Sequence, residues 1–142
     1  MNAPPPLRLS QTEVAAFLDA AFPASARAGF GTVDRLTHNH LRMRLEPDAS
    51  MIRPGDIVSG PVLMGLVDVA AYGVIAAHHG PEAMAVTNAL SIAFLRACAV
   101  QRVYADARLL KLGRRLATVD VRLWQGNEDR LIAQATVGYA LP

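Results

Sequence analysis

The sequence SGPVLMGLVDVAAYGVIAAHH, residues 59–79, decides the fold of this chain. Ser59 and Gly60 are residue types that commonly cap the start of a helix. Pro61 suits the first helical turn, because its missing N–H would have no intrahelical partner there. Gly80-Pro81 ends the segment, so the sequence predicts a helix from Pro61 to the end of the stretch. This helix is apolar on nearly every side, and other elements must therefore surround it.

The same segment is apolar enough to be tested as a membrane span. Residues 57–77 carry a single charge, Asp68, near their middle. A carboxylate at the centre of a spanning helix costs about 2.5–3.5 kcal/mol. The strand-like segments that follow would have no reason to lie beside a single span. We therefore expect a buried helix and no association with a membrane.

The sequence on either side of this helix predicts a sheet. A capping box at Ser10–Glu13 starts a short N-terminal helix that Pro23 ends. Alternation of polar and apolar residues predicts six strands, over residues 28–36, 39–46, 86–94, 103–109, 115–124 and 130–141. The last three strands have hairpin spacing and predict an antiparallel meander. This order predicts the α+β class, with an antiparallel β-sheet wrapped around one long central helix and a short helix before it.

Composition bounds the remaining possibilities. The 142 residues suit one domain, which we place at 10–142 after a flexible lead at 1–9. Apolar residues make up 52% and charged residues 18%, which favours an oligomer. The net charge is only +2 and no long Lys/Arg run occurs, so we expect no binding to nucleic acid. A single cysteine and an N-terminus without signal-peptide features predict a cytoplasmic protein.

Three blocks of sequence carry a resemblance to a known family. Residues 59–70 are similar to a His-Gly-Gly helix start that is followed by an Asp nine residues after its His. Residues 87–96 are similar to the strand after that helix, and residues 110–117 to a basic hairpin. Together, within residues 28–141, they resemble the hotdog-fold acyl-CoA thioesterases of the phenylacetate-degradation (PaaI) type. The resemblance implies a hotdog fold, an acyl-CoA substrate, a homodimer or dimer of dimers, and no cofactor besides the substrate's own coenzyme A.

Asp68 is the strongest candidate for chemistry. It is the only charged residue between Asp56 and Glu82, and a carboxylate in such apolar surroundings must be paired, neutralised or functional. A structural role, bonded to the backbone or to Arg96, is the alternative. The resemblance implies that Asp68 is the nucleophile or general base of a thioesterase.

Two further residues have implied roles in catalysis. The resemblance assigns the N–H of Gly60 to polarise the thioester carbonyl, and the hydroxyl of Thr87 to orient the attacking water. Plain helix capping at Gly60 and strand formation at Thr87 are the alternatives. Eight residues of helix separate Gly60 from Asp68 by about 12 Å, whereas reacting atoms must approach within about 3–3.5 Å. If both act on one thioester, they meet across a twofold dimer.

Other residues are candidates for binding substrate. Strand alternation groups Asn88 with Val86, Leu90 and Ile92 and predicts that it is buried. Tyr72 lies one turn beyond Asp68, as an acyl-pocket or core residue. The basic residues suit the phosphates of coenzyme A, although solvated positions explain them equally well. The full set is Ser59, Pro61, Tyr72, Asn88, Arg96, Lys111, Arg114 and Arg115.

The motif departs from the family pattern. Ser59 stands in place of the His and Pro61 in place of the second Gly, and the family's upstream Asn falls near Ile52 or Arg53. A non-catalytic hotdog protein that binds acyl-CoA or a partner is therefore the alternative, and a hotdog hydratase is weaker because no His lies near Asp68. The histidines at 38, 40, 78 and 79 lack a third ligand at motif spacing, so we expect surface positions and no metal site. Cys98 has no apparent base partner and is expected to behave as a small hydrophobe.

Overall fold

The computed structural model describes residues 3–142, so the first two residues of the predicted lead lie outside the described part. The elements follow the α+β order that the sequence predicts. They are α1 (Gln11–Ala21), α2 (Ala24–Arg27), η1 (Ala28–Phe30), β1 (Thr32–Thr37), β2 (His40–Leu45), η2 (Ala49–Met51), β3 (Ile52–Arg53), β4 (Ile57–Val58), α3 (Gly60–His79), β5 (Val86–Phe94), β6 (Val103–Leu112), β7 (Leu116–Trp124) and β8 (Leu131–Ala140).

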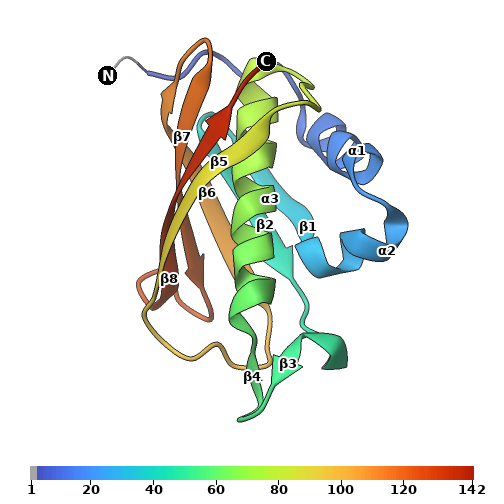
Figure 1. Cartoon of the computed structure of the whole chain (residues 1–142), viewed down its shortest axis with the longest axis vertical. Coiled ribbons are helices and arrows are strands. Elements are labelled where there is room, and N and C mark those ends of the chain that lie inside the picture. Colours follow the sequence, from blue (N-terminus) through green and yellow to red (C-terminus); the bar gives the residue numbers. More distant parts are fainter. Residues whose placement is uncertain (1–2) are drawn as a thin grey trace.

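One antiparallel sheet forms the body of the molecule. Its six strands lie in the order β1-β2-β6-β7-β8-β5, and the predicted meander is β6-β7-β8. The sheet curls around α3, while α1 and α2 lie to one side of that helix and the small β3-β4 pair lies beyond its N-terminal end (Figure 1). This is the hotdog arrangement, as predicted.

The central helix supplies more of the buried core than any other single element. Its buried side chains include Leu66, Val67 and Ile75, and they pack against inward-facing residues of β2, β6 and β7. By length and composition α3 could cross a membrane, but 67% of its most apolar window is buried inside the protein. It is the buried core helix, since the surrounding sheet already covers its apolar surface.

The N-terminal region differs from the prediction at the first strand. Residues 28–30 form a 3-10 turn, and β1 begins only at Thr32. The cause is Gly31, whose φ of 74° breaks the extended backbone, and a Cβ there would lie 2.6 Å from the carbonyl oxygen of Arg44. The capping box at Ser10 and Glu13 is present as predicted.

The lead lies against the C-terminal end of α3. The backbone N–H groups of Arg8 and Leu9 donate to the carbonyl oxygen of Ala77 over 2.8 and 3.3 Å. The guanidinium of Arg8 donates to the carbonyl oxygen of His79 over 3.1 Å. These bonds satisfy carbonyls that the end of a helix leaves without intrahelical partners.

Candidate active site

Asp68 meets two hydroxyl groups at the middle of α3. Thr87 Oγ1, on β5, donates a hydrogen bond to Asp68 Oδ1 over 2.7 Å. Tyr139 Oη, on β8, donates to the same oxygen over 2.6 Å and also lies 3.0 Å from the Asp68 backbone carbonyl oxygen. Thr87 and Tyr139 are opposite each other in the β5–β8 register, so neighbouring strands aim both hydroxyls at one carboxylate.

A β-bulge in β5 explains why Thr87 faces the helix. The pairing with β8 shifts between Thr87 and Ala89, which leaves Asn88 as the extra residue. The bulge changes the phase of the alternation, so Thr87 lies on the same face as Leu90, which packs against the core. Asn88 is exposed, and the prediction that it is buried is wrong for this physical reason.

Tyr139 is the site residue that the sequence analysis missed. Its side chain is 3% exposed. Burial, followed by the hydrogen bond to the Asp68 carboxylate, raises the pKa of the Tyr139 hydroxyl above its ordinary value, so this group stays protonated and donates. The available signal was a Tyr at an inward position of the last strand, because a buried Tyr hydroxyl needs a polar partner.

A cavity of about 340 Å³ opens beside this carboxylate. Tyr72 is both core and cavity wall: its hydroxyl donates to the Ala83 carbonyl oxygen over 3.0 Å. Its ring lies 5.2 Å from the ring of Phe17 and 5.9 Å from those of Phe22 and Tyr139. Small and aromatic residues surround Asp68 and Thr87 in the cavity wall. The full lining is Ala21, Phe22, Asp68, Tyr72, Ala83, Ala85, Val86, Thr87 and Tyr139.

Gly60 lies at a different cavity, of about 410 Å³, at the N-terminal end of α3. No side chain caps this helix end, and the Gly60 N–H has no hydrogen-bond partner within residues 3–142.

Arg96 lines the same cavity and donates to the Leu131 carbonyl oxygen over 2.9 Å. Arg96 therefore does not pair with Asp68. Cys98 is buried here, and burial raises the pKa of its thiol to about 11.

The remaining substrate-binding candidates are dispersed. Arg114 and Arg115 line a cavity of about 580 Å³ with Arg8 and His79, at the C-terminal end of α3. Lys111 is exposed on β6 and lines none of the cavities described here. Ser59 and Pro61 flank Gly60 as N-cap and early helical residue.

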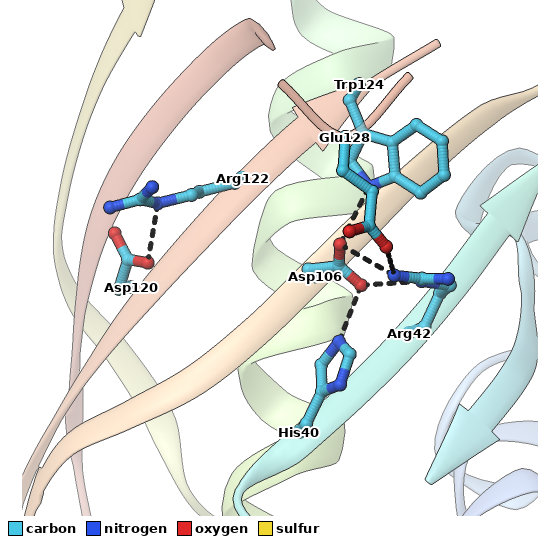
Figure 2. A network of polar contacts seen from close by, with 7 residues as sticks. All are labelled: His40, Arg42, Asp106, Asp120, Arg122, Trp124 and Glu128. Carbon is cyan, nitrogen blue, oxygen red and sulfur yellow. Dashed lines mark hydrogen bonds and ion pairs between the residues drawn. The ribbon is translucent and has the colours of Figure 1, made fainter. Parts of the chain in front are cut away.

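The sequence predicted that the histidines lie on the surface, and this prediction is wrong for His40 and His78, which are buried. His40 is buried against Asp106, with Nε2 2.7 Å from Oδ1, and Arg42 and Trp124 donate to the same carboxylate over 2.8 and 2.7 Å. Figure 2 shows these three side chains converging on Asp106 and Glu128 contacting Arg42. Burial alone would raise the pKa of Asp106, but these donors outweigh it and hold that pKa well below its usual range.

The Asp106 network is separate from the Asp68 site. Asp106 lies between Ala105 and Ala107, which face the core, so its side chain is on the outer face of the sheet. His78 is the second buried histidine. Within the described range, no three or more His, Cys, Asp or Glu side chains are grouped to hold a metal ion.

The fold and the carboxylate site define a hotdog-fold protein. Residues 55–132 match the Thioesterase superfamily, a stretch that contains Gly60, Asp68 and Thr87. The chain belongs to this superfamily. No curated protein matched the sequence.

Solved structures agree with this assignment. A candidate thioesterase from Silicibacter sp. TM1040 is 36% identical, with a TM-score of 0.85 and coverage of 96% of this chain and 94% of the other. A phenylacetic acid degradation-related candidate thioesterase from Ralstonia eutropha JMP134 is 24% identical, with a TM-score of 0.76 and coverage of 84% and 91%. The PaaI protein of the E. coli phenylacetic acid degradation operon is 17% identical, with a TM-score of 0.72 and coverage of 92% and 94%. The last two share the fold, as the resemblance implied.

Proposed function

We propose that this protein hydrolyses a small or aryl acyl-CoA thioester. The observation that carries the proposal is the Asp68 carboxylate, held by the hydroxyls of Thr87 and Tyr139 at the mouth of an aromatic-lined cavity. Membership of the Thioesterase superfamily supports thioester hydrolysis as the reaction class. The localisation we propose is cytoplasmic.

The chemistry requires a base or nucleophile and a group that stabilises an oxyanion. As a base, Asp68 takes a proton from water while the water oxygen attacks the thioester carbonyl carbon. The carbonyl electrons move onto oxygen, where the Gly60 N–H at the start of α3 stabilises the charge. Collapse of this intermediate breaks the C–S bond, and the departing thiolate takes the proton from the Asp68 carboxyl group.

As a nucleophile, Asp68 would instead displace the thiolate and form a mixed anhydride that water hydrolyses. Neither route uses a cofactor beyond the substrate's coenzyme A.

The cavity beside Asp68 supports a compact or aromatic acyl group. Its volume of about 340 Å³ is at the lower end of ligand cavities. Phe22, Tyr72 and Tyr139 give it aromatic walls, and aromatic rings prefer stacked or edge-on neighbours. Phe22, just after α1, makes the N-terminal helices part of this pocket.

A homodimer through β5 would complete the site. β5 is an edge strand, and large exposed apolar side chains lie on it or beside it, including Met84, Val86, Phe94 and Leu95. Val86 lines the Asp68 cavity and Phe94 lines the Gly60 cavity, at opposite ends of the strand. Antiparallel pairing of β5 with its copy places the start of one strand beside the end of the other. Each Asp68 cavity would then adjoin the Gly60 cavity of the other subunit, and two such dimers can associate further.

Arginines near the two ends of α3 are the candidates for binding coenzyme A phosphates. Arg114 and Arg115 at the β6–β7 hairpin line the largest described cavity together with Arg8. Arg96 lies at the Gly60 cavity. Guanidinium groups bind phosphate through paired, charge-assisted hydrogen bonds.

The test is release of free thiol from a panel of short, medium, long and aryl acyl-CoAs. Wild type should turn over at least one member, and Asp68→Asn should lose activity by more than about a hundredfold while remaining folded. Glu13→Gln, on the exposed start of α1, controls for loss of a carboxylate elsewhere. Equal turnover by wild type and Asp68→Asn would reject the proposal.

Ser59, in place of the family's His, favours one alternative. If folded wild type hydrolyses no member of the panel but binds a non-hydrolysable acyl-CoA analogue, the protein is a non-catalytic acyl-CoA-binding member of the fold. Asp68→Asn should then bind that analogue as tightly as wild type.

A further inference from the structure

The two carboxylate oxygens of Asp68 have different surroundings. Oδ1 accepts hydrogen bonds from both Thr87 and Tyr139. Oδ2 has no hydrogen-bond or ion-pair partner among residues 3–142. One oxygen is therefore fully engaged by the fold, and the other is free to interact with a ligand.

The Tyr139 hydroxyl is held more rigidly than that of Thr87. The Tyr139 ring is buried and stacked on Tyr72, with ring centroids 5.9 Å apart and planes 25° from parallel. Its hydroxyl lies within 3.0 Å of both the carboxylate and the backbone carbonyl of Asp68, so it binds side chain and helix backbone together. Thr87 is exposed and its hydroxyl can rotate toward water.

We propose that Tyr139 is a positioning residue for the thioesterase reaction: by holding Oδ1 it fixes the Asp68 rotamer and presents Oδ2 as the oxygen that reacts. This inference rests on the proposed function. It applies to both routes, because Oδ2 either takes the proton from water or attacks the carbonyl carbon. Tyr139 acts only through Asp68 and does not touch the reacting atoms.

Two kinetic consequences follow from this role. Loss of the Tyr139 hydroxyl leaves Oδ1 with Thr87 as its one donor among the described residues and lets the carboxylate turn. Loss of orientation lowers kcat by about tenfold or more, as expected for a hydrogen bond to a charged group. KM stays within about twofold, because acyl and coenzyme A contacts are unchanged.

The experiment measures kcat and KM of wild type and Tyr139→Phe on the best substrate of the panel. Phenylalanine keeps the buried ring and removes only the hydroxyl. Tyr104→Phe is the matched control, since the Tyr104 hydroxyl meets Arg102 and no residue of the site. A second variant carries 3-fluorotyrosine at position 139, which keeps the hydroxyl donor and should keep kcat within about twofold of wild type.

The outcomes separate this inference from the proposed function. A fall in kcat for Tyr139→Phe at unchanged KM, with kcat retained by the 3-fluorotyrosine variant, supports the positioning role. An unchanged kcat in both variants, with Asp68→Asn inactive, overturns the role of Tyr139 and leaves the proposed function standing. Activity in Asp68→Asn equal to wild type overturns both. A fall in kcat for Tyr139→Phe with a raised KM, or an equal fall in kcat for the 3-fluorotyrosine variant, would also overturn the inference.

Discussion

His78 is enclosed in the last turn of α3 with both ring nitrogens occupied. Nδ1 donates to the Val74 carbonyl oxygen over 2.9 Å, and Nε2 accepts from the Asn39 N–H over 3.0 Å. Both bonds require the neutral ring, because a protonated Nε2 cannot accept. Burial lowers the pKa of His78, the bond to Val74 opposes this effect, and nearby His38 adds to the lowering.

This arrangement predicts a pH-dependent stability. The folded pKa lies below the unfolded value of 6.5, so the stabilisation by neutral His78 is present above pH 6.5 and is lost as pH falls through the folded pKa. At pH 7.5, His78→Gln should cost about 1–3 kcal/mol of unfolding free energy, as expected for disrupted buried hydrogen bonds. Urea denaturation from pH 7.5 to 5 should show the difference from wild type shrinking. His79→Gln is the control, and a pH-independent difference for His78→Gln would contradict the prediction.

At the scale of elements, three strands are joined on the outer sheet face. Asp106 on β6 accepts from His40 and Arg42 on β2 and from Trp124 on β7. Removal of this acceptor leaves the buried donors of His40 and Trp124 unpaired and leaves Arg42 with only the exposed Glu128 as a partner, which is more damaging than loss of an exposed pair. The network is a cross-strand connection, and it lies on the face opposite α3 and Asp68.

Asp106→Ala should therefore lower the unfolding free energy by about 3–5 kcal/mol. Glu46→Ala, which breaks an exposed pair with Arg102, should leave the unfolding free energy close to that of wild type, because exposed ion pairs contribute little. Chemical denaturation of both variants gives the comparison, and kcat per folded molecule should match wild type in each. Similar small losses for both variants would mean that the network contributes no more than surface ion pairs.

The strands and the residues between them show how much of the fold and of the candidate site the sequence predicts. The period-two pattern identified β6, β7 and β8, because their residues alternate regularly between core and outside. It failed at Asn88, since a bulge inserts a residue without any change in the apolar pattern around it. His40 and His78 were misplaced because their partners, Asp106 and Asn39, are distant in sequence. Asp68 was identifiable from its isolation among apolar residues, whereas Tyr139 depended on strand register.

At the scale of the whole molecule, the two edges of the sheet differ. At the β1 edge, the Gln11 side chain donates to the Asp34 carbonyl oxygen over 3.3 Å and accepts from the Leu36 N–H over 3.1 Å. Helix α1 thus occupies backbone groups that an edge strand would otherwise offer. Among residues 3–142 no such cover lies over β5, where Val86 and Phe94 are 56% and 48% exposed. An uncovered apolar edge favours pairing with another copy at β5 rather than at β1.

If the dimer forms through β5, each active site combines Gly60 of one subunit with Asp68 of the other, and two inactive variants should complement each other. Gly60→Pro removes the N–H at a position where proline is tolerated, and Asp68→Asn removes the base or nucleophile. In a mixed dimer, one site carries both changes and the other carries neither.

Random pairing makes half of the dimers mixed, so co-refolding equal amounts of the two variants should restore about a quarter of wild-type kcat per chain. Thiol release from the acyl-CoA panel measures the recovery, and each variant refolded alone provides the background. If both groups served a site within one chain, every site in the mixture would lack one of them, and activity would stay at background.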